Sequence, residues 1–412
     1  MKKNNTKIMQ APDPAESRNG LIAVCLAAAA ALFVIWTFTG KWPWVGHYYN
    51  SYILQAQSWL EGRLDLGQNY SYLEIAIFDG KYYISFPPFP SYLMLPFVFL
   101  GWDTCDGFIA FMSAVAAGAY AYKILEHFGI EKDRAVFFAL FLTIGSNWLF
   151  TAQVAWVWFI AQNMAFTLSL MAIYYALKGK AGISLFVWAC AVGCRPFNAL
   201  YIPVLLYILY MQHMDENPDD KLKDVIRKRW KAVIPMAVIA ISYMVLNYAR
   251  FGNPIEFGHN YLPEFTDAED GQFNLSYMPE NIQALFRFPK ISFSEAWEYQ
   301  AFNGTCMFLV SPIFISCAVY GVRYLLKADK SRRILMLIIL VMIIAEIAVI
   351  TAHKTMGGSQ FGNRYTNDVL PMAFLGLAVS LPKDSKWDKF NLILFVLGLT
   401  LNAIGSVLYY TK

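Results

Sequence analysis

The chain has 412 residues, of which 58% are hydrophobic, 17% are aromatic and only 15% are charged. In soluble domains about a quarter of the residues are charged, whereas a charge in the hydrocarbon core of a bilayer costs several kcal/mol. The composition therefore excludes an ordinary soluble domain and predicts an all-α protein that crosses a membrane many times. A formal net charge of only +4, without one basic patch, excludes nucleic acid as a partner.

The first twenty residues are polar and include Lys2 and Lys3. They do not resemble a cleavable signal peptide, and the apolar run that follows is long enough to be a retained span. We therefore expect a cytoplasmic tail at residues 1–20. The remainder, 21–412, is expected to be a single integral membrane domain, because no linker or internal repeat divides it.

A transmembrane helix needs about 20 apolar residues. About eleven stretches qualify, alone or with a short break, and they lie at residues 21–39, 105–125, 135–150, 154–177, 183–194, 197–211, 232–248, 307–326, 334–351, 369–381 and 390–410. Two long polar segments, at about 40–104 and 250–303, separate some of these stretches. We expect these segments to be large loops with surface helices and a small β-hairpin.

Lysine and arginine concentrate in the short cytoplasmic loops of membrane proteins. With the N-terminus in the cytoplasm, the basic runs near Lys123, Lys178 and 221–231 all fall on the inner side, and the two long loops fall outside. This topology requires the proline-flanked run 89–100 not to span, so we expect it to lie on or dip into the outer leaflet. The expected location is a cytoplasmic membrane, with the functional residues on its outer face.

The first outer loop contains a predicted hairpin. Asp79-Gly80 stands between two β-prone runs, which is a strong signal for a tight turn. Alternation along the first run places Glu74 among apolar and aromatic neighbours close to the membrane. Asp79 is a second candidate carboxylate, although its more common role at such a position is the turn itself.

Other polar candidates map to the same side of the membrane. They are Arg195 at the outer end of a span, His259 and Tyr261 in the second loop, and Arg364, Tyr365 and Asp368 in a short glycine-rich segment. Arginine binds phosphate bidentately, a carboxylate can act as a general base, and aromatic faces suit sugar rings. Together these residue types favour a site for a lipid-linked phosphate.

Ordinary structural roles compete with these assignments. Arg195 could anchor the end of a span, His259 is equally well an ordinary loop histidine, and Arg364 and Asp368 could form a simple i, i+4 ion pair. Glu346 lies inside an apolar run and is a functional candidate by default.

The motifs YILQAQSWLEGRLDL, EIAIFDGKYYISFPPFP, GCRPFN, FGNPIEFGHNY and FGNRYTNDVLP together resemble the bacterial multi-spanning glycosyltransferases of the C-type fold (GT-C). The resemblance covers residues 47–371 and is to a poorly characterised branch. It implies an enzyme that takes a sugar from a polyprenyl-phosphate carrier and transfers it to a glycan or lipid acceptor at the outer face, with membrane lipids around it.

The sequence departs from that family in one respect. Many members have a catalytic carboxylate just after the first span, but residues 40–60 contain no Asp or Glu. We therefore assign the catalytic carboxylate to Glu74, with Asp79 as the other candidate. Arg195, His259, Tyr261, Arg364, Tyr365 and Asp368 are assigned to substrate and phosphate binding.

No cofactor is predicted with certainty. The six cysteines follow no metal-ligand spacing, so a divalent ion such as Mg²⁺ or Mn²⁺ is left open. An inverting glycosyltransferase is the first hypothesis, and a transporter or flippase of a lipid-linked saccharide is the alternative. The absence of an inverted repeat in the sequence disfavours the transporter alternative. A non-catalytic membrane subunit is a third hypothesis.

Overall fold

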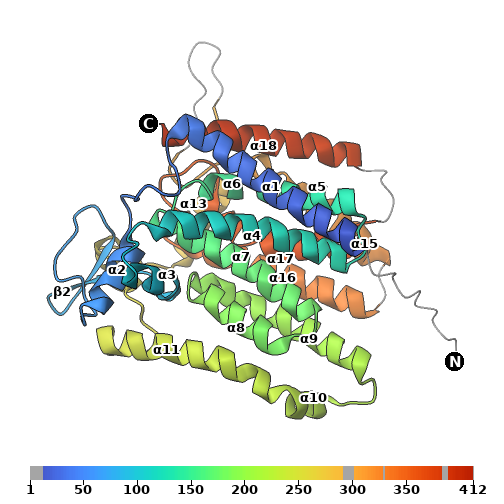
Figure 1. The fold of residues 1–412 in the computed structure, drawn as a ribbon, viewed down its shortest axis with the longest axis horizontal. Coiled ribbons are helices and arrows are strands. Elements are labelled where there is room, and N and C mark those ends of the chain that lie inside the picture. Colours follow the sequence, from blue (N-terminus) through green and yellow to red (C-terminus); the bar gives the residue numbers. More distant parts are fainter. Residues whose placement is uncertain (1–12, 291–300, 328–329, 383–387, 412) are drawn as a thin grey trace.

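The computed structural model describes residues 13–290, 301–327, 330–382 and 388–411. The first twelve residues of the expected cytoplasmic tail and residues 291–300 of the second loop therefore lie outside the described residues. The described chain is mostly helical, with one two-stranded sheet (Figure 1).

The helices of the first half are α1 (Pro14–Thr39), α2 (Ser51–Leu60), α3 (Phe89–Phe99), α4 (Cys105–His127), α5 (Lys132–Thr143), α6 (Trp148–Thr151), α7 (Val157–Leu177), α8 (Ala181–Val192), η1 (Pro196–Tyr201) and α9 (Ile202–Glu216). Those of the second half are α10 (Leu222–Arg229), η2 (Trp230–Val233), α11 (Ile234–Phe251), η3 (His259–Tyr261), α12 (Pro263–Thr266), η4 (Leu275–Tyr277), α13 (Met278–Phe286), α14 (Met307–Val310), α15 (Ile313–Lys327), α16 (Lys330–Ala352), η5 (Arg364–Asn367), α17 (Leu370–Ser380) and α18 (Asp388–Tyr410).

All eleven predicted apolar stretches contain helix, but the described residues hold only six helices long and apolar enough to cross a membrane: α1, α4, α7, the continuous segment Leu222–Phe251, α16 and α18. The other five stretches form α5, α8, α9, α15 and α17, of 11 to 15 residues each. At 1.5 Å per residue a 12-residue helix is about 18 Å long, which is less than the hydrocarbon thickness of about 30 Å. The chain is thus an integral membrane protein, but the expected number of eleven spans is not supported.

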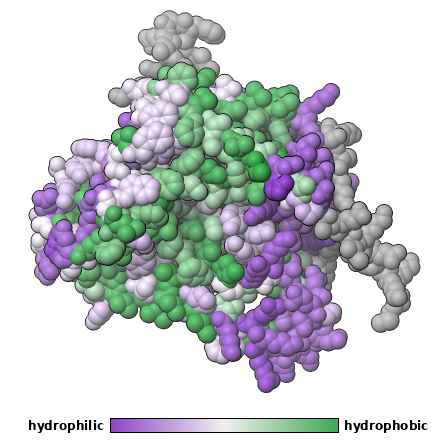
Figure 2. Space-filling model, viewed as in Figure 1, coloured by the Kyte–Doolittle hydropathy of each residue, from purple (hydrophilic) through white to green (hydrophobic). Residues whose placement is uncertain are grey.

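The long helices lie side by side, and the hairpin with α2 and α3 covers one end of the bundle (Figure 1). The basic helix α10 and the start of α1 lie at the opposite end. Between these two ends the visible surface is mainly apolar (Figure 2), as lipid contact requires. Which end faces which compartment stays a prediction.

The hairpin forms as predicted from Asp79-Gly80. Strands β1 (Ile75–Phe78) and β2 (Lys81–Ile84) pair antiparallel, with Phe78 opposite Lys81. Both turn residues have positive φ, 49° at Asp79 and 70° at Gly80, as a two-residue hairpin turn of the I′ type requires. The conformation of Asp79 is therefore explained by the turn.

Helix α3 coincides with the run that was expected not to span. Its 11 residues begin after Pro87-Pro88 and pack against α2. The length excludes a full crossing by this helix alone, while its position in the outer leaflet is not tested.

Candidate functional site

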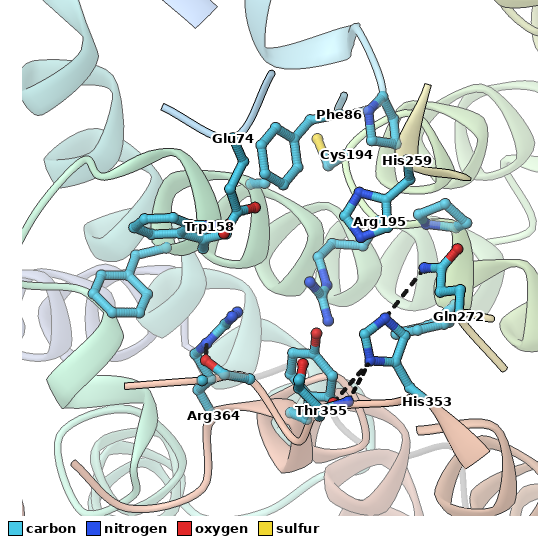
Figure 3. A pocket seen from close by; sticks show the side chains of 18 of the residues that line it. Glu74, Phe86, Trp158, Cys194, Arg195, His259, Gln272, His353, Thr355 and Arg364 are labelled. Carbon is cyan, nitrogen blue, oxygen red and sulfur yellow. Dashed lines mark hydrogen bonds between the residues drawn. The ribbon is translucent and has the colours of Figure 1, made fainter. Parts of the chain in front are cut away.

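A cavity of about 670 Å³ opens at the hairpin end of the bundle. Its walls come from loops far apart in the sequence: the hairpin, the start of α7, the turn between α8 and η1, the second long loop, and the segment that joins α16 to η5. Figure 3 shows Glu74, Arg195 and Arg364 extending from three sides toward one common space.

Glu74 stands directly before β1 and is held by its surroundings. Its backbone carbonyl accepts a hydrogen bond from Ser85 Oγ at 3.1 Å, and its carboxylate accepts one from Trp158 Nε1 at 2.9 Å. Burial raises the pKa of this carboxyl above its ordinary value, although the Trp158 hydrogen bond and the charge of Arg364 partly oppose that effect. A fixed carboxylate with a raised pKa is suited to take up a proton.

Arg195 follows Gly193-Cys194 in the turn after α8 and pairs with Asp368, which is 173 residues away. The Arg195 Nε atom lies 3.1 Å from Asp368 Oδ2, and Gln162 Nε2 donates to Asp368 Oδ1 at 3.0 Å. Asp368 is buried and does not line the cavity. The alternative of a surface pair between Arg364 and Asp368 is therefore wrong, because Asp368 neutralises Arg195 instead.

Arg364 is the second cation of the cavity. Its Nε donates to the carbonyl of Gly357 at 2.9 Å, while its Nη1 is buried and has no hydrogen-bond partner among the described residues. Buried donors in proteins are rarely left unpaired, so an anion in the cavity is a natural partner for this atom. Burial lowers the pKa of Arg364, and the charge of Arg195 lowers it further.

The ring of Tyr365 contacts both guanidinium groups. Its ring centroid is 4.9 Å from Cζ of Arg364 and 5.0 Å from Cζ of Arg195. Cation–π contacts at such distances contribute about 0.5–2 kcal/mol each. The tyrosine ring thus offsets part of the repulsion between two like charges that lie near one another.

The segment before Arg364 depends on glycine. Gly362 has a φ of 79°, and a Cβ atom there would lie 2.1 Å from Asn147 Nδ2. Asn147 fixes this segment, because its Oδ1 accepts from the backbone N of Asn363 at 3.0 Å and its Nδ2 donates to the Phe361 carbonyl at 3.2 Å.

Gly362→Ala is expected to destabilise the protein, because the left-handed backbone costs a non-glycine residue about 1–3 kcal/mol and the methyl group also displaces Asn147. The measurement is the apparent Tm of the purified protein in detergent. Gly252→Ala is the control: Gly252 has a similar φ of 66° but nothing within 4 Å of its added Cβ. Equal Tm losses in the two variants would contradict the role of Asn147.

Two histidines form another side of the cavity. His259 Nδ1 lies 3.2 Å from the carbonyl of Ser85, and His353 Nδ1 lies 2.8 Å from the carbonyl of Thr355. Burial lowers the pKa of His259 to about 3, with the neighbouring His353 adding to the effect. Burial likewise lowers the pKa of His353 to about 4.

The structure brings five of the eight predicted site residues to the cavity wall: Glu74, Arg195, His259, Arg364 and Tyr365. Asp79 is exposed in the hairpin turn and Tyr261 packs on Phe78, 4.7 Å between ring centroids, so neither lines the cavity. Tyr261 does not reach the cavity because its ring packs in an aromatic cluster with Phe78 and Phe251.

Sequence reasoning did not select Trp158, Gln272 or His353, which also line the cavity. No local signal distinguishes them, since each is an ordinary residue in its own segment. Glu346, by contrast, is buried within α16 away from the cavity lining, and neither of its carboxylate oxygens has a hydrogen-bond partner in the described part of the chain. Among the described residues, no group of three or more His, Cys, Asp and Glu side chains is arranged to hold a metal ion.

No family model matches the chain, and no curated protein matches it in sequence. Two solved structures are similar: the oligosaccharyltransferase of Archaeoglobus fulgidus in its apo form, with a TM-score of 0.53, and the archaeal oligosaccharyltransferase AglB of Archaeoglobus fulgidus with an inhibitory peptide and a dolichol-phosphate, with a TM-score of 0.44. Each match has 12% identity, covers 95% of this chain and 56% of the other, so the chain spans little more than half the length of those proteins. The first match shows that this chain has a fold similar to that of the Archaeoglobus fulgidus oligosaccharyltransferase.

Proposed function

We propose that the chain is a membrane glycosyltransferase that takes a sugar from a polyprenyl-phosphate-linked donor and transfers it to a glycan or lipid acceptor at the outer face of a bacterial cytoplasmic membrane. The similarity in fold to an oligosaccharyltransferase supports the class of reaction. The arrangement of the cavity supports the donor type.

The observation that carries this proposal is that Glu74 and two arginines share a cavity with aromatic walls, which Glu256 and Glu264 also line. Glu74 comes from the first loop, Arg195 from the turn after α8, and Arg364 from the segment before α17. The buried Nη1 of Arg364 has no hydrogen-bond partner among the described residues, and a phosphate oxygen would be an acceptor for it. A cavity of about 670 Å³ lies within the usual range for small-molecule sites, about 300–1,000 Å³.

In this mechanism the two arginines hold the phosphate of the donor and stabilise the charge that develops on it. Glu74 takes the proton from the acceptor hydroxyl while the acceptor oxygen forms a bond to the anomeric carbon. The bond from that carbon to the phosphate oxygen breaks, and the polyprenyl phosphate leaves with the electron pair. Attack opposite the leaving group inverts the anomeric configuration.

The acid limb of the kcat/KM profile is expected above the ordinary carboxyl value of 4.5, because burial raises the pKa of Glu74 and only its deprotonated form accepts a proton. Trp158→Phe removes the hydrogen bond that lowers this pKa, so the limb should move to still higher pH. The measurement is kcat/KM against pH for both proteins. A limb that Trp158→Phe leaves in place would show that another group titrates.

The proposed function is tested with the purified protein in nanodiscs, a panel of polyprenyl-phosphate sugars and a simple glycan acceptor, with and without EDTA. Release of carrier phosphate together with a glycosylated product supports the proposal, and the EDTA arm reports whether a divalent ion takes part. No turnover of any donor, combined with movement of a lipid-linked sugar between leaflets, would instead establish the transporter alternative.

A further inference from the structure

The cavity lining contains two chemically different groups of side chains. The first group is Glu74, Arg195 and Arg364, which are charged or can be charged and reach into the cavity from three directions (Figure 3). The second group is His259, Gln272 and His353, which we call the histidine wall. Figure 3 shows the histidine wall across the cavity from Trp158 and Arg364.

Backbone hydrogen bonds between the second long loop and the segment after α16 fix the position of the histidine wall. Phe273 and His353 form a β-bridge, and the backbone N of Lys354 donates to the Gln272 carbonyl at 2.9 Å. Asn281 Nδ2 donates to the carbonyl of His353 at 2.7 Å. The second long loop and the segment after α16 are therefore joined directly behind the side chains in question, and the wall is preorganised.

The hydrogen bonds of His353 are those of a neutral ring. Its Nδ1 lies 2.8 Å from the Thr355 carbonyl and 3.1 Å from the Thr355 backbone N, so it can donate to the carbonyl or accept from the N–H but not both. Its Nε2 lies 3.1 Å from Gln272 Nε2. An amide nitrogen can only donate, so His353 Nε2 accepts and carries no proton. This assignment leaves the side-chain oxygen of Gln272, Oε1, without a hydrogen-bond partner among the described residues and able to accept one from a ligand.

His259 is arranged in the same way. Its Nδ1 lies 3.2 Å from the Ser85 carbonyl and so donates to it, which leaves Nε2 as an acceptor without a partner among the described residues. Burial beside His353 keeps the pKa of His259 low. The wall thus offers neutral hydrogen-bonding groups rather than cations.

Aromatic rings surround these polar groups. The ring centroid of Phe265 is 5.0 Å from that of His259, and the ring centroid of Phe273 is 5.1 Å from that of His353. Phe273 also lines the cavity. Neutral donors and acceptors set among aromatic rings suit an uncharged, hydroxyl-rich ring, whose apolar face packs on an aromatic and whose hydroxyls replace water as partners.

We propose that His259, Gln272 and His353 form the subsite for the sugar of the donor, and that this sugar is uncharged. The two arginines bind the carrier phosphate, so the arginines and the histidine wall bind different parts of the donor. This inference rests on the proposed function and specifies which residues recognise the sugar. It also narrows the role of His259, which the sequence assigned to substrate and phosphate binding, to contact with the sugar.

The test compares the binding of two probes to the wild-type protein in nanodiscs: a polyprenyl phosphate and the same lipid bearing a neutral hexose. His353→Phe keeps an aromatic ring but removes both ring nitrogens, and Gln272→Leu removes the amide. Each variant is expected to bind the hexose-bearing lipid about tenfold more weakly, since each removes a hydrogen bond inside the cavity. Binding of the bare polyprenyl phosphate should be unchanged. Arg364→Ala is the matched control and should weaken the binding of both lipids.

Loss of both probes in the histidine-wall variants, or of neither, would overturn the subsite assignment. Gln272→Leu guards against misfolding of His353→Phe, because in the described part of the chain the Gln272 side chain hydrogen-bonds only to His353. The binding comparison requires no turnover. A wild-type protein that prefers the hexose-bearing lipid but transfers nothing would retain the subsite and reject the enzyme. A wild-type protein that transfers sugar but does not prefer the hexose-bearing lipid would support the enzyme and reject the subsite.

Discussion

Glu74→Gln is expected to lower the rate of sugar transfer about 10²–10⁴-fold, the usual contribution of a general base. The glutamine has the same shape, and its side-chain oxygen can still accept the Trp158 hydrogen bond that the carboxylate accepts at 2.9 Å. The fold should therefore be retained, and the loss should appear in kcat rather than in the affinity for the donor. The measurement is steady-state transfer from the polyprenyl-phosphate donor identified in the panel.

Asp79→Asn is the matched control for this experiment. Asp79 belongs to the same hairpin but is exposed in its turn, at a φ of 49°, and asparagine tolerates that conformation well. This variant should retain wild-type transfer. A folded Glu74→Gln protein with full activity would remove Glu74 from the mechanism, whereas loss of activity in Asp79→Asn would return the second carboxylate to consideration.

Sequence patterns predicted where the helices and the hairpin lie, but they did not predict the lengths of the helices. Apolar runs located the helices because burial in lipid and in the protein core both require apolar side chains. The same ambiguity explains why eleven stretches qualified as spans while only six helices of the described residues are long enough to cross: α5 and α17 are apolar but short, and many of their residues are buried against other helices. The hairpin was predictable because Asp79-Gly80 specifies its turn locally.

The site was only partly predictable, because its members meet through tertiary contacts. The polar residues near the ends of the predicted spans could be identified one by one, since polar groups are costly there. Their partners could not: Asp368 pairs with Arg195 across 173 residues rather than with Arg364 four residues away. His353 and Gln272 face the cavity only because the second long loop is bridged to the segment after α16, and no local pattern reports that bridge.

Arg195→Met is expected to destabilise the protein by about 3–5 kcal/mol, because it leaves the carboxylate of Asp368 buried without its counter-ion. The Asp368 side chain is 1% exposed, against 13% for that of Arg195. Gln162 Nε2 would remain as a neutral donor to Asp368 at 3.0 Å, which cannot replace a charge. The measurement is the apparent Tm in detergent. The comparison is with Arg364→Met, which does not leave a buried carboxylate without its counter-ion.

The double variant Arg195→Met/Asp368→Leu separates the structural role of the pair from its role in binding. Replacement of a buried ion pair by apolar residues of similar volume is often neutral or stabilising, so the double variant should recover most of the Tm that Arg195→Met loses. Its affinity for bare polyprenyl phosphate should nevertheless stay low, because the guanidinium group of Arg195 is still missing from the cavity. Recovery of both Tm and phosphate binding would mean that Arg195 serves only to neutralise Asp368, and Arg364 would then be the phosphate contact that remains in the mechanism.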